Sequence, residues 1–244
     1  MVNQRLSRRR TERRASVQPP VTLNARGRRS RELLKRAARE VLNERGYRAL
    51  RVQDVTARAG VATGLFYRYF HDLREIVAEI AQDFFAELLE NADPVAANEH
   101  RYDWIFGNLC NVVRRFAQNP GILACLFGLA GDYEEFDRIW KENAHRWNLR
   151  VAEYLKRDAG FDAAHSRRIG FVLGAMTEGV IYQALIRRTG DLLAFGARPE
   201  DIADVLAVML YRAIFLSDPP IGRLRPAGRR LINGKIRRVG TRGP

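Results

Sequence analysis

The chain has 244 residues, enough for one large domain or two small ones, and 46% of them are hydrophobic, as is ordinary for soluble proteins. Basic residues outnumber acidic ones by 42 to 28, and the whole excess lies at the ends: residues 1–31 carry +9, residues 217–244 carry +7 and residues 32–216 carry −2. The two cysteines, Cys110 and Cys125, form no C-x-x-C pair, which argues against a disulfide framework or a zinc site and fits a reducing cytoplasm.

Both ends are rich in Gly, Pro and Arg and lack periodic apolar residues, so we predict disordered basic arms over residues 1–27 and 217–244. Such arms can follow a phosphate backbone and raise non-specific DNA affinity, or they can be solvated tails with no specific role. The N-terminal end shows no apolar run typical of a signal peptide. The longest apolar stretches, 169–186 and 202–216, are interrupted by polar residues or too short to span a bilayer, so no membrane partner is expected.

Between the arms the apolar pattern is helical throughout, with no convincing strand of period two. A first helix is expected to begin at about Ser30, a good N-cap, and to end before Gly46. A D-x-x-E box at Asp72 and Glu75 predicts the start of a fourth helix. The fold class is all-α, with about nine helices expected near residues 30–45, 52–59, 63–70, 72–91, 98–118, 121–131, 133–158, 162–188 and 199–216.

Two of these helices, 52–59 and 63–70, are joined by a tight turn at Gly60, and such a pair forms a helix-turn-helix. The second helix of this unit enters the major groove of DNA. Its Phe66 and Phe70, four residues apart, are expected to face the core. The opposite face is suited to phosphates and base edges, and consists of Thr63, Gly64, Tyr67 and Arg68, with Leu65 at its margin. The alternative is a plain three-helix core with a solvated polar face.

Residues 46–70 resemble the DNA-binding segment of the TetR family of regulators, and the A-G-V…G-x-x-Y-x-Y-F core at 59–70 matches it nearly position by position. The resemblance implies about nine helices, of which the first three bind DNA and the fourth links the domains. The remaining helices would form a ligand-binding and dimerisation body. The chain is thereby divided into a DNA-binding domain at 28–75, with its motif at 51–70, and a body at 76–216.

Carried over by position, the resemblance implies DNA contacts at Thr63, Gly64, Leu65, Tyr67, Arg68 and Tyr69. Three positions depart from the family pattern: Arg51 replaces a usual threonine, Ala62 a serine, and Leu73 a lysine that touches the DNA backbone. Ala62 has no side chain that can cap a helix, so the third helix is expected to start at Thr63. Arg51 and Arg74 are expected to supply backbone charge in place of the lysine.

The stretches 169–186 and 202–216 are apolar on nearly every side of the predicted helix, so other parts of the protein must pack against more than one of those sides. A single large body could supply this packing. The two-fold, four-helix interface that the resemblance implies explains it more simply. We therefore expect a homodimer, which also suits the recognition of two DNA half-sites.

Large aromatic residues with few polar ones gather between the linking helix and these stretches. The candidate ligand-binding residues are Trp104, Phe106, Phe127, Trp140, Asn143, Trp147, Thr177, Glu178 and Tyr182. Such residues line small-molecule pockets, and they also form ordinary cores. Glu178 is the only acid in its apolar stretch; it could bind a polar or cationic ligand group, or pair with an arginine or tyrosine of the protein. The aromatic lining favours a mostly apolar ligand.

An enzyme is not expected, because the four histidines fit no metal-binding spacing and the chain has no G-x-S-x-G elbow, P-loop or dinucleotide fingerprint. No catalytic residue, metal site or cofactor is predicted. A non-specific architectural nucleic-acid binder would explain the basic ends but not the slightly acidic helical body. The sequence predicts a transcriptional regulator, most simply a repressor that leaves a palindromic operator on double-stranded DNA when a small, mostly apolar effector binds its body.

Overall fold

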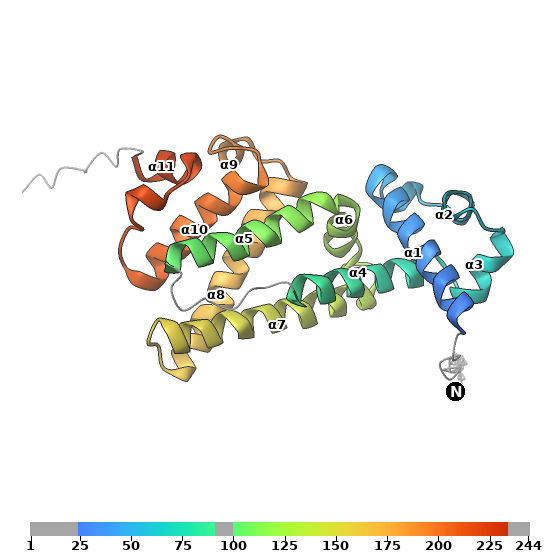
Figure 1. Cartoon of the computed structure of the whole chain (residues 1–244), viewed down its shortest axis with the longest axis horizontal. Coiled ribbons are helices and arrows are strands. Elements are labelled where there is room, and N and C mark those ends of the chain that lie inside the picture. The colour runs from blue at the N-terminus through green and yellow to red at the C-terminus, as the bar shows by residue number, and fades with distance from the viewer. Residues whose placement is uncertain (1–23, 91–99, 234–244) are drawn as a thin grey trace, which may run out of the picture.

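A computed structural model describes residues 24–90 and 100–233, and within these ranges every regular element is a helix or a helical turn. This confirms the all-α fold. The helices α1–α3 form a small group at one end of an elongated molecule, and α4 reaches from them into a larger body (Figure 1). The α-helices are α1 Ala25–Arg45, α2 Val52–Ala59, α3 Thr63–Tyr69, α4 Leu73–Glu90, α5 Arg101–Gln118, α6 Pro120–Leu129, α7 Glu134–Asp158, α8 Ala163–Ile181, α9 Gly190–Leu193, α10 Pro199–Phe215 and α11 Pro226–Asn233.

The described residues thus hold eleven α-helices, where the sequence predicted about nine. The two additional ones are the single turn α9 and the C-terminal α11. The predicted helix over 162–188 is α8, which continues as a π-helical turn over Tyr182–Ile186. By length and composition, Ala163–Ile186 could cross a membrane, but core helices of soluble proteins pass the same test.

The first helix begins earlier than the predicted Ser30. The side chain of Asn24 accepts a hydrogen bond from the backbone N–H of Gly27 at 2.8 Å, so α1 is capped there. Asparagine caps helices as well as serine does, and arginine is a good helix former, which explains the longer helix. Residues 25–27, expected in the N-terminal arm, are therefore helical, and the rest of that arm, 1–23, lies outside the described residues.

The turns of the small domain follow the sequence closely. Gly46 and Gly60 both have positive φ, 73° and 67°, which end α1 and α2 in conformations that a Cβ would oppose. The predicted box before α4 is also present. The Asp72 carboxylate accepts from the N–H of Glu75 at 2.9 Å, and the Glu75 carboxylate accepts from the N–H of His71 at 2.5 Å.

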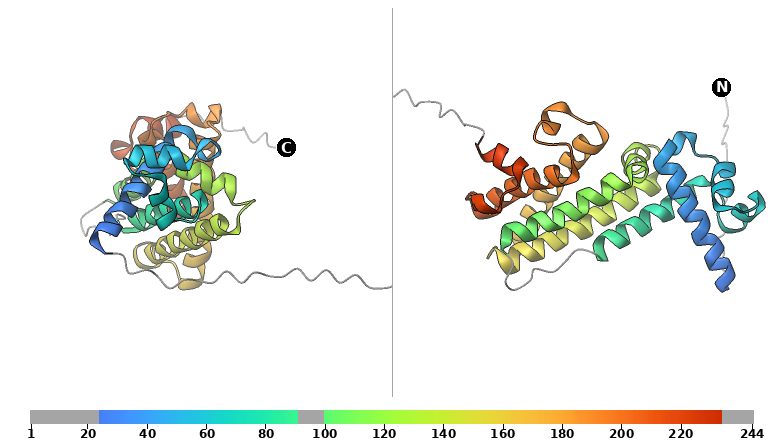
Figure 2. Two further views of the ribbon diagram at one scale, coloured as in Figure 1. Left: turned by 90° about the vertical axis from the view of Figure 1, so that its right-hand side faces the viewer. Right: turned by 45° about the horizontal axis from the view of Figure 1, so that its top comes forward.

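In the body, α7 packs along α8, and α5 packs along α10 (Figure 2). Two glycines allow the first pair to approach closely. A Cβ at Gly170 would lie 2.9 Å from the carbonyl oxygen of Asn148, and a Cβ at Gly174 would overlap the Asn148 side chain. Because the backbones of α7 and α8 meet at these positions, the side chains that neighbour Asn148 on α7 have a fixed position relative to α8.

The C-terminal segment corrects the prediction of a disordered arm from residue 217. Residues 217–233 are described and include α11, which packs on α10. The fully buried carboxylate of Asp204 accepts hydrogen bonds from the N–H of Gly228 and from the hydroxyl of Tyr102. A carboxylate from α10 thus caps the start of α11. Only the last part of the predicted arm, residues 234–244, lies outside the described residues.

Candidate nucleic-acid interface and internal cavities

Helix α3 divides into a core face and an outer face, as predicted. Phe66 and Phe70 are buried, with ring centroids 5.7 Å apart, and they pack into the core of the small domain. Tyr67, on the opposite side, is 61% exposed. This contrast between neighbouring residues fixes which side of the helix is available to a partner.

The outer face collects most of the predicted DNA-contacting residues. Thr63, Gly64 and Arg68 are exposed, while Leu65 and Tyr69 are half-buried at the edges of the face. Helix α3 starts at Thr63, as expected, and Ala62 makes no side-chain capping bond. Among the described residues no acidic side chain pairs with Arg68, so its guanidinium is available for a phosphate or a guanine.

The structure does not bring Arg51 and Arg74 to this face as free cations. The guanidinium of Arg51 donates to the carbonyl oxygens of Arg48 and Leu50, at 2.8 and 2.9 Å. Arg74 lies over the ring of Tyr133 with its guanidinium carbon 5.5 Å from the ring centroid, beside the carboxylates of Asp72, just before α4, and Glu135 of α7. Their predicted role in place of the missing lysine therefore requires these contacts to be exchanged for contacts to DNA.

The small domain is attached to the body by a row of ion pairs between α1 and α4. Arg31, Lys35 and Arg39 recur every four residues on α1 and pair with Glu79, Asp83 and Glu87, which recur at the same interval on α4. Burial opposes the charge on Lys35, but hydrogen bonds to Asp83 and Glu32 outweigh it and raise the pKa of this lysine. The orientation of α1 therefore depends on the position of α4.

A second contact joins α1 to the start of α6. The Asn43 side chain accepts from the N–H of Gly121 at 3.0 Å, and a Cβ at Gly121 would lie 2.4 Å from the carbonyl oxygen of Leu42. The backbones of the two helices thus touch at a position where only glycine fits. The small domain is held to the body at two separate places.

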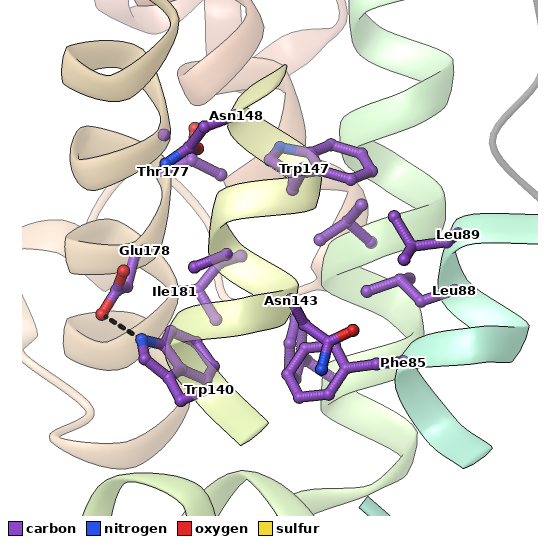
Figure 3. A pocket seen from close by; sticks show the side chains of 14 residues that line it. Phe85, Leu88, Leu89, Trp140, Asn143, Trp147, Asn148, Thr177, Glu178 and Ile181 are labelled. Carbon is purple, nitrogen blue, oxygen red and sulfur yellow. Dashed lines mark hydrogen bonds between the residues drawn. The ribbon is translucent and has the colours of Figure 1, made fainter. Parts of the chain in front are cut away.

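The body holds a first, partly open cavity of about 70 Å³ between α4, α5, α7 and α8 (Figure 3). Its walls are mostly apolar, and its polar groups come from α7 and α8. Five of the predicted ligand-binding residues line it, and they are Trp140, Asn143, Trp147, Thr177 and Glu178.

Glu178 and Trp140 contact each other in the wall of this cavity. The indole N–H of Trp140 donates to Oε1 of Glu178 at 3.0 Å, so the internal partner is neither the arginine nor the tyrosine considered from the sequence (Figure 3). Burial raises the pKa of the Glu178 carboxyl, and the hydrogen bond from Trp140 offsets only part of this effect. No ion pair of the described residues includes Glu178.

A second cavity, of about 50 Å³, lies between α5, α7, α8 and α10. It shares Trp147, Gly174 and Thr177 with the first, and Trp104 lines it as predicted. Tyr154 also lines it and is only 5% exposed, yet its hydroxyl has no hydrogen-bond partner. Burial raises the pKa of Tyr154 to about 12.

Three predicted ligand-binding residues line neither cavity. Phe106 lies under the guanidinium of Arg225, 3.8 Å from its ring centroid, because it is two residues from Trp104 and so projects from a different side of α5. Phe127 and Tyr182 pack on each other, and Phe127 also packs on Trp140, behind the wall of the first cavity. All three are half-buried and pack against other side chains of the body, and their predicted contact with a ligand stays a prediction.

Sequence reasoning missed other lining residues. Phe85, Leu88 and Leu89 of α4 line the first cavity although this helix was treated as a linker. Tyr154 follows Trp140 and Trp147 at intervals of seven residues, and this spacing places all three on one side of a helix. This seven-residue spacing is the pattern in the sequence that could have predicted Tyr154 as a lining residue.

Residues 34–80 match the model of a family described as bacterial regulatory proteins, tetR family. This segment holds most of α1, all of α2 and α3, and the start of α4, with the described geometry of a helix-turn-helix. In this segment, which covers the helix-turn-helix and its flanking helices, the chain is similar to the tetR family. The resemblance seen in residues 46–70 is thereby confirmed.

Solved structures extend the likeness of fold to the body. A transcriptional regulator from Rhodococcus sp. Rha1 is 19% identical, with a TM-score of 0.61 over 75% of this chain and 97% of that one. A putative TetR-family regulator from Syntrophomonas wolfei is 18% identical, with a TM-score of 0.59 over 77% and 96%. Reduced NemR from E. coli is 18% identical, with a TM-score of 0.58 over 78% and 100%. No curated protein sequence matches.

Proposed function

We propose that this TetR-family protein is a cytoplasmic, homodimeric repressor that leaves a palindromic operator when a small molecule binds its body. Helices α1–α3 would form the DNA-binding domain, and the remaining helices the effector-binding and dimerisation body. The neighbours of similar fold are named as regulators, and we propose no catalytic activity.

The observation that carries the DNA-binding part is the outer face of α3. It presents an exposed arginine without an acidic partner, an exposed tyrosine and a glycine on a helix whose other face is locked by Phe66 and Phe70. A rigid helix with this chemistry suits insertion into a major groove. Arg68 is the residue best placed to bond guanine, and Tyr67 to bond a phosphate.

The effector part rests on α4. This helix contributes Phe85, Leu88 and Leu89 to the first cavity, and the same helix carries the acidic side chains that pair with α1. A molecule that enlarges the cavity would displace α4 and, through the ion pairs, α1 and the α3 face. Binding energy in the body would thus change the distance between the two recognition helices of a dimer.

The deciding experiment is selection from a pool of random double-stranded DNA. We would use the full chain and a shortened chain of residues 24–233, which keeps α1 and α11 intact. Both should enrich the same palindrome, with half-sites about one helical turn apart. The shortened chain should bind more weakly, with a smaller dependence on salt, if the basic ends follow phosphates.

In the same experiment, Arg68→Ala should weaken binding to the enriched site by about tenfold or more, because a guanine contact contributes about 1–3 kcal/mol. Arg146→Ala, an exposed arginine on α7, is the control and should leave affinity unchanged. Loss of all sequence preference in the shortened chain would contradict the proposal and favour the architectural nucleic-acid binder.

A further inference from the structure

The first cavity combines aromatic walls with an unpaired acid. Its rings come from three helices and are those of Phe85, Phe116, Trp140 and Trp147. None of the residues that line it is basic, so nothing in the lining neutralises Glu178. Aromatic faces and a carboxylate both attract a positive charge, and neither attracts a negative one.

Most of the polar atoms in this cavity that can form further hydrogen bonds are acceptors. The amide N–H of Asn143 donates to the carbonyl of Ile139 at 2.7 Å, which leaves the amide oxygen of Asn143 available. The hydroxyl of Thr177 donates to the carbonyl of Leu173 at 2.9 Å, which leaves its lone pairs. Glu178 accepts one bond from Trp140 and can accept more. The exceptions are the amide of Asn148, which offers both donors and acceptors, and the second N–H of Asn143.

We propose that the effector is a lipophilic organic monocation, with its ammonium group against Glu178 and its apolar part between the aromatic side chains. This inference rests on the proposed function and specifies the ligand of the same site. A protonated amine supplies the donors that the acceptor groups lack, and its charge pairs with a half-buried carboxylate through a charge-assisted hydrogen bond.

The second cavity gives the apolar part room to extend. It adjoins the first across Trp147 and Thr177, which line both. Movement of the Trp147 side chain would join the two into one elongated site. The unpartnered hydroxyl of Tyr154 lies at this far end and would donate to an acceptor on a longer ligand.

The test uses three probes of similar shape on the full-length protein: 4-phenylbutylamine, 4-phenylbutanol and 4-phenylbutyrate. They differ in being cationic, neutral and anionic at neutral pH. Binding would be measured by titration calorimetry, with quenching of tryptophan fluorescence as a second readout. We expect the amine to bind about tenfold or more tightly than the alcohol, and the carboxylate to bind least.

The Glu178→Gln variant keeps the size of the side chain and an oxygen for the Trp140 N–H. It should lower the affinity for the amine about tenfold and leave that for the alcohol within about twofold. Glu142→Gln, which changes an exposed acid of α7 that does not line the cavity, is the control and should change neither affinity. Unchanged operator binding by Glu178→Gln without ligand would show that the variant is folded.

Any of four results would overturn the assignment of a cation. The amine and the alcohol could bind equally, the carboxylate could bind most tightly, no probe could bind, or Glu178→Gln could keep the same preference for the amine over the alcohol. Operator release is measured separately. Selective amine binding without release would support the cation site and contradict the proposed effector function, so the two failures are distinguishable.

Discussion

At the scale of single residues, Glu178 is a carboxylate in an environment that opposes its charge. Burial raises its pKa, and the hydrogen bond from Trp140 compensates only in part. When the pKa of a carboxyl is higher in the folded than in the unfolded chain, its protonated form favours folding. This contribution to the free energy of unfolding is fully present at pH values below the pKa of the unfolded chain. That contribution is lost as the pH rises through the folded pKa. Glu178 is therefore a cost to the fold at neutral pH.

Glu178→Gln should accordingly stabilise the protein at neutral pH. The glutamine has no charge to bury and still accepts from Trp140, so we expect a rise in Tm of about 1–3 °C near pH 7.5. The gain should shrink near pH 4, where the native carboxyl is protonated. Circular dichroism melting curves at both pH values would measure it, with Glu142→Gln as the exposed control. A lower Tm at neutral pH would show that the charge stabilises the fold.

The sequence indicated that Glu178 was unusual, because it was the only acid in an apolar stretch. It could not indicate Trp140 as the partner. The two residues are 38 positions apart, and their contact depends on how α7 packs against α8. The spacing of apolar residues along one helix predicts which side of that helix is buried, but it does not predict which residues of another helix pack against that side.

At the scale of elements, α11 shows how a short helix depends on another. Its eight residues are too few to form a stable helix alone. Asp204 of α10 supplies the acceptor for Gly228 at its start and also holds the Tyr102 hydroxyl of α5. One buried carboxylate therefore ties three helices together.

Asp204→Ala should remove this junction at a cost of about 3 kcal/mol, because buried donors on α5 and α11 lose their acceptor. Urea unfolding would measure the loss, and trypsin should cut at Arg229 or Arg230 faster in the variant than in the unaltered protein as α11 detaches. Asp103→Asn is the control, since Asp103 makes partly exposed pairs with Arg223 and Arg225 worth less than about 1 kcal/mol. Equal stability of the two variants would contradict the role of Asp204.

At the scale of the whole molecule, the proposed homodimer depends on the outer sides of α8 and α10. Phe171, Val172 and Met209 are 38, 67 and 42% exposed, although they belong to the long apolar stretches of the body. Most of α10 is already covered inside the chain by α5 and α11. The apolar surface left for a partner subunit is therefore mainly on α8.

Val172→Arg should convert the dimer to a monomer, since it places a charge in the centre of this surface. Light scattering after size-exclusion chromatography would give the mass, and operator affinity should fall because one subunit contacts one half-site. Ile221→Arg is a matched control, because Ile221 is 66% exposed but lies in the C-terminal segment. A dimer that survives Val172→Arg and dissociates with Ile221→Arg would place the interface on that segment instead.

The sequence by itself determined the helix-turn-helix of the small N-terminal domain. Its helices, its glycine turns and the division of α3 between Phe66 and Tyr67 depend on residues close together in the chain, so local periodicity and turn chemistry carry the information. The tertiary structure decided which aromatic residues surround a cavity, what Glu178 bonds, and that residues 226–233 form a helix. Those features join α4, α5, α7, α8, α10 and α11, and their contacts are set by side-chain packing between distant segments, which no local pattern encodes.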